Sequence, residues 1–433
     1  MSHAQLATSL LRFTTAGSVD DGKSTLIGRL LYDNNAILDD QLAAIKSQSS
    51  DDIDLARLTD GLRAEREQGI TIDVAYRYFT SGTRKFIIAD SPGHIEYTRN
   101  MITAASNSEL AVVLVDASKG IIEQTRRHIY LASLLGLSHL VVCVNKMDLV
   151  DYSAAAFNSI KLELNALKAR LRFSQIKVIP LSAYHGDNVV TASIRMPWYK
   201  GPTLIKYLQT VNPSPENTAA YARFPIQYVI RADQHDKTKS GNGYARGYAG
   251  KVASGNFAVG DAVMVLPRLR KSRIKRILKY DGELSEGQTG DSVVIVLADE
   301  LDVGRGDVLV KATQPAYLSS KVRATLCWLD QSALVPGRTY LLKQSTQLVR
   351  ARVDTIDDTV DINTLDRITA AGDTTLSLNQ IGTVALVLSD ALVFDSYANN
   401  RALGSFILID ETTHATAAAG LLLEPDFAGE QAP

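Results

Sequence analysis

Residues 17–24 place glycines, a lysine and a serine at fixed positions between a strand and a helix. The segment reads Gly17-Ser18-Val19-Asp20-Asp21-Gly22-Lys23-Ser24 and fits the pattern G-x-x-x-x-G-K-[ST]. The preceding residues 11–16 predict a short strand, and residues 25–32 have the leucine spacing of a helix. A loop in this setting turns its N–H groups inward and holds phosphate at the positive end of the helix. The alternative is a glycine-containing turn that binds nothing.

The composition is that of a multidomain globular protein without strong net charge. Of the 433 residues, 45% are hydrophobic, 46 are Lys or Arg, and 47 are Asp or Glu. This length predicts about three domains, and the charge balance argues against bulk electrostatic binding of nucleic acid. Cys143 and Cys327 lie far apart and predict neither a disulfide framework nor a metal site. Without a long apolar run or a secretory signal at the start, we expect a cytoplasmic protein.

Residues 1–212 alternate short apolar runs with segments of helical period. Five runs have the length and β-branched content of buried parallel strands, namely 11–16, 86–89, 110–115, 140–144 and 176–181. Helices are expected at 22–32, 95–105, 121–135, 153–171 and 202–209. The alternation predicts an α/β domain with a doubly wound, mostly parallel sheet, in which ligands bind at the carboxyl ends of the strands.

The strand at 86–89 runs directly into Asp90-Ser91-Pro92-Gly93-His94. A carboxylate at this point can reach Mg²⁺, and the Gly93 N–H can meet a γ-phosphate and turn away when that phosphate leaves. Taken alone, the segment is better explained as a plain Pro-Gly turn. Its place downstream of the glycine-lysine loop favours the nucleotide interpretation.

Two further strands end in segments that suit recognition of guanine. They lead into Asn145-Lys146-Met147-Asp148 and into Ser182-Ala183-Tyr184. An aspartate such as Asp148, accepting from a ring N–H and an exocyclic amine, selects guanine because adenine would leave its carboxylate unpaired. The stem of Lys146 can cover one face of the base, and the Ala183 N–H can bond the guanine O6.

A long polar connection separates the first helix from a strand expected at 72–79. Near its end lies Gln68-Gly69-Ile70-Thr71-Ile72-Asp73. Thr71 can bind Mg²⁺ and the γ-phosphate when the segment is ordered, and its release after hydrolysis would make the segment a switch. A connection as long as 34–70 is typically functional; the alternative is a pair of surface helices.

In this order the motifs resemble those of the translation-factor class of GTPases. The resemblance implies GTP and Mg²⁺ as ligands and phosphoryl transfer to water. It implies catalytic roles for Lys23, for Thr71 and for His94, which would orient the attacking water. The residues expected to contact GTP are 17–24 with Thr25, then 90–94, 145–148 and 182–184. The expected Mg²⁺ ligands are Ser24, Thr71 and Asp90.

The histidines and Asp20 carry further expectations. The alternative interpretation of His94 is that it is a switch-loop histidine that faces solvent. Asp20 lies where it could coordinate a monovalent cation beside the phosphates. The other histidines show no ligand-like spacing and are expected at surface or capping positions; they are His3, His128, His139, His185, His235 and His414.

Longer segments resemble the large, GTP-hydrolysing subunits of bacterial ATP sulfurylase, or sulfate adenylyltransferase. The matching segments are 17–33 and 60–79, and the similarity is strongest before residue 150 and patchier after 230. Elongation factors usually differ at Asp21, Gln68 and Ser91. It implies a heterodimer with a smaller subunit that forms adenylylsulfate and diphosphate from ATP and sulfate, helped by GTP hydrolysis. Some relatives continue into an adenylylsulfate kinase domain, but this chain contains no second phosphate loop.

After a Pro- and Asn-containing linker at 212–217 the helical period disappears. Strand-like runs separated by turn signals predict two antiparallel β-barrels, at 213–314 and 315–433. In the first barrel the runs are 224–231, 244–253, 262–266, 273–280 and 292–297; in the second they are 322–329, 339–343, 348–353, 382–388 and 405–410. The loop 231–243 departs from the sulfurylase pattern. The basic run 268–276 fits a solvated hairpin better than a nucleic-acid or acidic-partner surface.

Two other functions stay open. One is an elongation-factor-like GTPase that delivers aminoacyl-tRNA, against which the near-neutral charge and the departures at Asp21, Gln68 and Ser91 count. The other is a nucleotide-binding scaffold that hardly hydrolyses GTP. Salt-sensitive tRNA binding in the GTP state would support the first, and turnover that survives loss of His94 would support the second.

Overall fold

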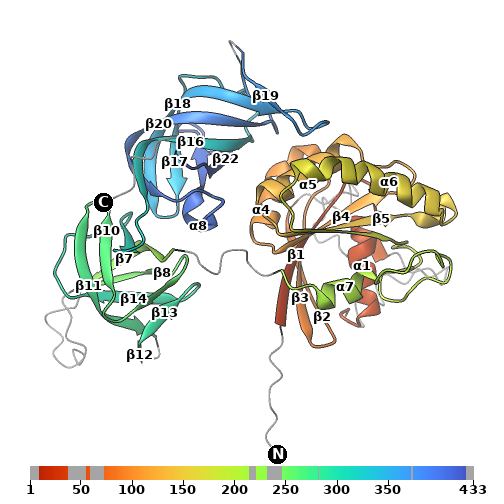
Figure 1. The fold of residues 1–433 in the computed structure, drawn as a ribbon, viewed down its shortest axis with the longest axis horizontal. Coiled ribbons are helices and arrows are strands. Elements are labelled where there is room, and N and C mark those ends of the chain that lie inside the picture. Colours follow the sequence, from red (N-terminus) through yellow and green to blue (C-terminus); the bar gives the residue numbers. More distant parts are fainter. Residues whose placement is uncertain are drawn as a thin grey trace, which may run out of the picture. The chain divides into compact units, whose positions relative to one another are not determined.

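The computed structural model describes residues 9–37, 55–58, 73–213, 221–231, 246–280, 282–371 and 374–425. The chain divides into two compact units. The first is Met1–Glu216 with Asp361–Asp366, and the second is Asn217–Val360 with Arg367–Pro433. Figure 1 shows helices packed around a sheet in the first unit and strands dominating the second.

The first unit is built on a six-stranded sheet with the order β2-β3-β1-β4-β5-β6. Its strands are β1 (Ser9–Ala16), β2 (Ala75–Ser81), β3 (Arg84–Asp90), β4 (Leu110–Asp116), β5 (His139–Asn145) and β6 (Gln175–Pro180). All neighbours are parallel except β2, which runs antiparallel to β3. Every residue of β4 is buried, because a central strand of a sheet covered on both faces meets no solvent.

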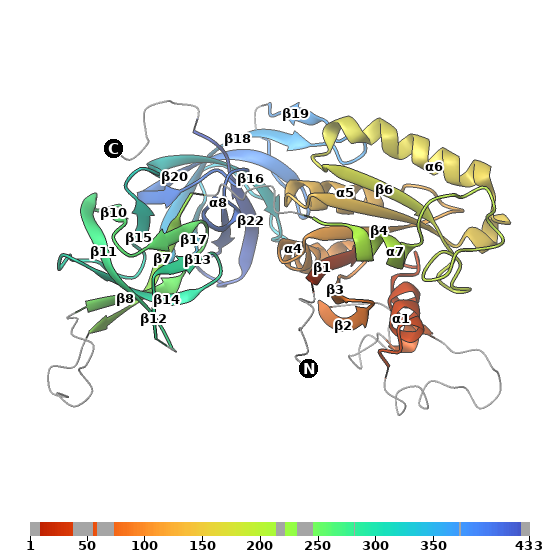
Figure 2. The ribbon, with the colours of Figure 1, turned by 60° about the horizontal axis from the view of Figure 1, so that its bottom comes forward.

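Helices cover both faces of this sheet, which confirms the predicted doubly wound α/β fold. They are α1 (Lys23–Asp33), α4 (Thr98–Ser106), α5 (Glu123–Leu134), α6 (Ala154–Leu167) and α7 (Leu204–Thr210). Helices α1 and α7 lie on one face, and α4, α5 and α6 lie on the other (Figures 1 and 2). Two expected helices differ at their ends: 3-10 turns at Ile95–Tyr97 and Lys168–Arg170 take the place of the first turn of α4 and the last turn of α6.

The second unit contains two closed six-stranded antiparallel barrels, as predicted. In the first barrel the ring β10-β15-β7-β8-β14-β11 closes because β10 also pairs with β11; in the second, β17-β21-β22-β16-β20-β18 closes through β17 and β18. The first ring consists of β7 (Arg223–Arg231), β8 (Arg246–Lys251), β10 (Ala262–Leu266), β11 (Arg270–Lys279), β14 (Ser292–Leu297) and β15 (Val308–Lys311). The second consists of β16 (Tyr317–Trp328), β17 (Thr339–Gln344), β18 (Gln347–Val360), β20 (Ile381–Phe394), β21 (Ser405–Ile409) and β22 (Thr416–Leu422).

The barrels hold elements that the expected strands did not include. Besides the ring strands β15 and β22, these are β9 (Asn256–Ala258), β12 (Gly282–Leu284), β13 (Glu286–Gln288), β19 (Arg367–Thr369) and the short helix α8 (Arg401–Gly404). The basic run lies on the β10–β11 hairpin, where Lys271, Arg273 and Lys275 are exposed between the buried Ser272 and Ile274. The loop 231–243, which departs from the sulfurylase pattern, falls almost entirely outside the described residues.

Of the helices in the described ranges, none combines the length and apolar character needed to cross a membrane.

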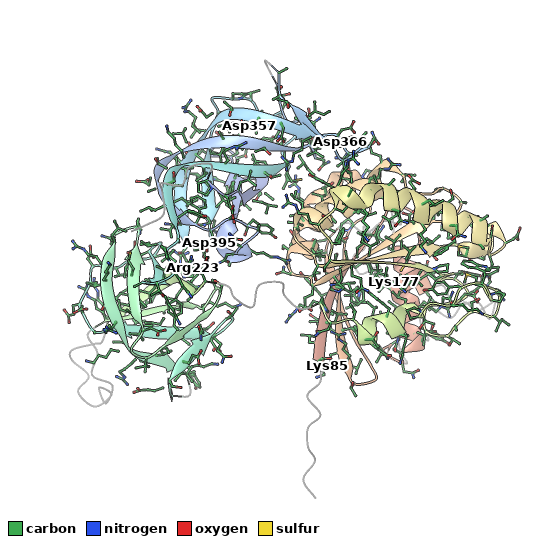
Figure 3. The ribbon with its side chains drawn as sticks, in the orientation of Figure 1. Lys85, Lys177, Arg223, Asp357, Asp366 and Asp395 are labelled. Atoms are coloured by element: carbon green, nitrogen blue, oxygen red, sulfur yellow. The ribbon has the colours of Figure 1, made fainter. Side chains whose placement is uncertain are left out.

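A buried guanidinium joins the two barrels of the second unit. Arg223, fully buried at the start of β7, forms a two-pronged ion pair with Asp395 through Nε at 2.9 Å and Nη2 at 2.8 Å. Its other N–H groups donate to the carbonyls of Ala222, Gln314 and Pro315. Figure 3 labels the two charged residues of the pair. Because all five guanidinium donors are used, the charge is buried at little cost in lost hydrogen bonds.

We expect Arg223→Met to destabilise the second unit by about 3–5 kcal/mol, since it leaves the Asp395 carboxylate buried without its counter-charge. The exposed pair Arg350–Glu411 in the same unit provides the control, because Arg350→Met should cost under about 1 kcal/mol. Urea unfolding of the full chain followed by Trp328 fluorescence, in a Trp198→Phe background, measures both. Equal midpoints for the two variants would contradict the argument.

Candidate functional site

A cavity of about 360 Å³ opens at the carboxyl ends of the sheet strands in the first unit. Its lining comes from four separate segments of the chain. The residues are Val19, Asp20, Gly22, Lys23, Ser24, Thr25, Ala56, Gly93, His94 and Lys146. The fold therefore brings the loop after β1, the segment after β3 and the segment after β5 to one place, as the sequence predicts for a sheet of this topology.

The loop 17–24 has a conformation that depends on its glycines. Gly22 has a φ of 91° and immediately precedes α1. A Cβ at Gly22 would lie 2.4 Å from the Asn145 side-chain nitrogen, so a larger residue would strain both loops. The buried carboxylate of Asp21 accepts the Ser18 N–H at 2.7 Å and closes the loop on itself. Burial raises the pKa of Asp21, against the opposing effects of this hydrogen bond and of Lys23.

Lys23 folds back over its own loop. Its Nζ donates to the carbonyls of Gly17 at 3.1 Å and Ser18 at 3.0 Å. Burial lowers the pKa of the ammonium, whereas the charges of Asp90, Asp21 and Asp20 act in the opposite direction. A lysine that lines a cavity beside the start of a helix is placed to bind an anion.

Asn145 ties three loops together. Its Nδ2 donates to the Asp21 carbonyl at 2.8 Å, and its Oδ1 accepts the Ala183 N–H at 2.9 Å. The side chain is buried, so both bonds form away from water and hold the loops after β1, β5 and β6 in one arrangement. The Ala183 N–H already donates to the Asn145 Oδ1. It could therefore bond a guanine O6 only by sharing its hydrogen between the two acceptors.

Asp148 has the open hydrogen-bonding capacity that base recognition requires. Its Oδ1 is buried and lacks a hydrogen-bond partner. A buried carboxylate oxygen without a donor is costly, and a ligand that brings N–H groups would satisfy it. Guanine brings such N–H groups on one edge, so the site fits this base.

Sequence reasoning missed Asp116, which positions Lys146. The Asp116 carboxylate is buried at the end of β4 and lies 2.9 Å from the Lys146 Nζ. Burial raises the pKa of Asp116, but hydrogen bonds from Ser118 and Lys146 outweigh it and hold the pKa below its ordinary value. The signal was available, because Asp116 ends a fully apolar strand at the edge where ligands bind.

Arg29 on α1 was also missed. Its Nε donates to the Ala183 carbonyl at 3.1 Å, and its Nη2 donates to the carbonyl of Tyr184. Helix α1 therefore holds the loop after β6 in addition to following directly on the loop 17–24. Nothing in the spacing of the motifs points to this contact.

The segment Asp90–His94 packs directly on the loop 17–24. Asp90 is buried and accepts the Thr15 hydroxyl at 3.2 Å, while the Ser91 hydroxyl donates to the Thr15 carbonyl. The His94 ring lines the cavity, stays 40% exposed, and accepts the Glu96 N–H at Nδ1. His94 is therefore at the cavity, partly open to solvent.

The donor set of the cavity suits Mg²⁺. Ser24, which lines the cavity, supplies a hydroxyl at the first turn of α1, and Asp90, three residues before the lining residue Gly93, supplies a buried carboxylate; both are oxygen donors of the kind Mg²⁺ prefers. Among the described residues, no group of three or more His, Cys, Asp or Glu side chains is arranged to hold a metal ion. The third expected ligand, Thr71, lies outside the described residues, as does most of the segment 68–73.

One expected surface histidine is buried instead. His128 lies on α5 with 1% of its surface exposed and with Nδ1 unpartnered. The sequence prediction was wrong here because α5 turns this face towards the sheet, and a histidine within a helix carries no sign of which face it occupies. Burial first, and then the charges of Lys23 and Arg127, lower the pKa of His128 to about 3.

Models of two domain families match the chain. The Elongation factor Tu GTP binding domain matches residues 8–214, and the GTP-eEF1A C-terminal domain-like family matches residues 321–423. Among solved structures, the GTP-bound GTPase-like domain of S. cerevisiae Ski7 has a TM-score of 0.51 at 18% identity, covering 96% of this chain and 98% of its own. At that identity the likeness concerns the fold alone.

Curated relatives match almost the whole chain. Sulfate adenylyltransferase subunit 1 of Cellvibrio japonicus is 47% identical over 98% of this chain and 89% of its own length. The bifunctional enzyme CysN/CysC of Mycobacterium tuberculosis is 49% identical over 98% of this chain and 69% of its own length. The bifunctional enzyme NodQ of Rhizobium meliloti is 46% identical, over 96% and 64% respectively.

The titration of His128 predicts how stability depends on pH. Because its folded-state pKa is about 3 and the ordinary value is 6.5, the unfolded chain binds one more proton between these values. The contribution of His128 to the free energy of unfolding is fully present above about pH 6.5. It falls towards pH 3 by roughly 1 kcal/mol per pH unit. Urea unfolding followed by helical circular dichroism should show this slope in wild type and in the exposed-site control His185→Gln. The slope should flatten in His128→Gln; identical slopes in all three proteins would refute the assignment.

Proposed function

Because this chain belongs to the sulfate adenylyltransferase subunit 1 family, with a GTP-binding domain of the elongation factor Tu type, we propose that it hydrolyses GTP to promote sulfate adenylylation by a smaller partner subunit. The partner would join ATP and sulfate into adenylylsulfate and diphosphate. The observation that carries the guanine-nucleotide part is the buried, unpartnered Oδ1 of Asp148, two residues after Lys146, which lines the cavity together with Lys23 and Ser24.

The nucleotide-binding roles follow from the chemistry of the cavity residues. The N–H groups of the loop 17–24, the start of α1 and Lys23 would hold the β- and γ-phosphates. Asp148 would accept from the base, the Lys146 stem would cover one base face, and Asn145 would keep the loops after β1, β5 and β6 in place. The remaining contacts are proposed for Thr25, Ser91, Pro92, Met147, Ser182, Ala183 and Tyr184.

The hydrolytic roles concern the charge that develops on the transferred phosphoryl group. Lys23 would stabilise that charge, and His94 would orient the attacking water. Ser24, Thr71 and Asp90 would hold Mg²⁺, which, when bound, neutralises the β- and γ-oxygens. Thr71 and the Gly93 N–H would sense the γ-phosphate. Asp20 is the proposed site of a monovalent cation beside the phosphates.

The base assignment predicts a change of specificity. Asp148→Asn exchanges an acceptor for a group that can donate, which suits the additional oxygen of xanthine and opposes the guanine amine. We expect GTP affinity to fall about 100-fold or more, in line with the discrimination of sites that hydrogen-bond a substrate's polar groups, and xanthosine triphosphate binding to appear. Titration calorimetry with both nucleotides measures this, and Asp151→Asn serves as a nearby control.

The coupling is tested by adenylylsulfate formation. This chain is mixed with its candidate small subunit, ATP and sulfate, with and without GTP. We expect GTP to raise product formation and to be hydrolysed alongside it. His94→Ala should lower both by about 10²–10⁴-fold, the usual contribution of a proton-transfer or water-orienting group, without weakening GTP binding.

Two outcomes would overturn the proposal. If GTP binds tightly but changes neither product nor rate, the coupling is absent, and salt-dependent tRNA binding becomes the next assay. If His94→Ala turns over GTP as fast as wild type in the active complex, the chain acts as a nucleotide-dependent scaffold.

A further inference from the structure

One glutamine of α5 connects the two loops that face each other across the phosphate end of the cavity. Gln124 lies in the first turn of α5, and its Nε2 donates to the Gly93 carbonyl. Its Oε1 accepts the Ser18 hydroxyl at 3.1 Å. Both ends of one amide are thus used, one on each loop.

Gly93 lies very close to the loop 17–24 in this arrangement. A Cβ at Gly93 would lie 2.2 Å from the Lys23 Nζ and 2.9 Å from the Gly17 carbonyl oxygen. The end of the Lys23 side chain can move, but the Gly17 carbonyl is backbone, so it limits the space on this side of Gly93. Because the Lys23 ammonium donates to the Gly17 and Ser18 carbonyls, a γ-phosphate that entered here would have to displace both this ammonium and Gly93.

The helix that carries Gln124 is the fixed side of this contact. Residues Ile129, Leu131 and Ala132 of α5 are buried in the first unit. His128, one helical turn after Gln124 and therefore on the same face of α5, is buried as well. An amide anchored on such a helix moves little, so the segment Asp90–His94 is the part that must yield.

We propose that Gln124 is a positioning residue that holds Gly93 down on the loop 17–24 and has to release it when a γ-phosphate enters. The proposal rests on the proposed function, because it assumes guanine nucleotides as ligands. The Gln124 bridge is compatible with a nucleoside diphosphate, which carries no γ-phosphate, and competes with a triphosphate. Gln124 therefore lowers the preference for triphosphate over diphosphate without touching the nucleotide.

The test compares affinities of the full chain for GDP and for a non-hydrolysable GTP analogue, each measured by titration calorimetry with Mg²⁺. In Gln124→Ala we expect the ratio of the GDP dissociation constant to that of the analogue to rise about 3- to 10-fold, the effect of losing roughly one hydrogen bond. Gln124→Glu should raise the ratio as well, because a carboxylate can accept from Ser18 but cannot donate to the Gly93 carbonyl.

Glu123→Gln is the matched control, because the Glu123 side chain lies next to Gln124 in the sequence, is exposed, and pairs with Arg127 on the same helix. Its ratio should equal that of wild type. A ratio that stays within twofold of wild type in Gln124→Ala, or a loss of affinity shared equally by both nucleotides, would overturn the proposal. If wild type bound neither nucleotide, the proposed function would fail first. Thermal melting of each variant verifies that the folded protein was titrated.

Discussion

The arrangement of the loops around the cavity depends on a single buried amide. Asn145 uses both ends of its side chain, one on the Asp21 carbonyl and one on the Ala183 N–H. A buried amide with satisfied partners holds its neighbours more strictly than apolar contact does, because any displacement leaves a polar group unpaired. The loops after three strands consequently form one arrangement, supported from outside by Arg29 and Asp116. Gly93, in the Asp90–His94 segment, is held differently, because its carbonyl accepts from the side chain of Gln124.

This division agrees with the work the site has to do. The proposed base recognition needs fixed donors and acceptors, and the Asn145 arrangement would hold them in place before a nucleotide binds. Sensing of a terminal phosphate needs a part with two positions, and Gly93 lies against Lys23 at a distance that only a residue without a side chain permits. A glycine at that point provides both the close approach and the freedom to leave.

Sequence patterns revealed most of the fold and the proposed site, because buried parallel strands and phosphate loops leave local marks. The run Leu110–Val115 and the spacing of Lys23 and Ser24 needed no tertiary information. Strands β18 and β20 were recognised only in their first halves, since shifts of register along β18 interrupt its two-residue alternation. Gln124, Arg29 and His128 could not be assigned from sequence, because a polar residue on a helix reveals its role only through the face it presents. Thr71 falls outside the described residues, so its assignment stays a prediction.

The ion pair between Arg223 and Asp395 also bears on how the chain can be recombined. A guanidinium whose five donors reach a carboxylate of one barrel and carbonyls on either side of the junction is complete only when both barrels are present. The apolar patch beside it is likewise made from both, with Met264, Leu266 and Val310 meeting Val393 and Leu403. In evolution and in protein engineering, the two barrels are therefore expected to be exchanged together, as one unit. A chimera that exchanges one of them must bring a matching acid or base with it, whereas an exchange of the pair carries its own counter-charge.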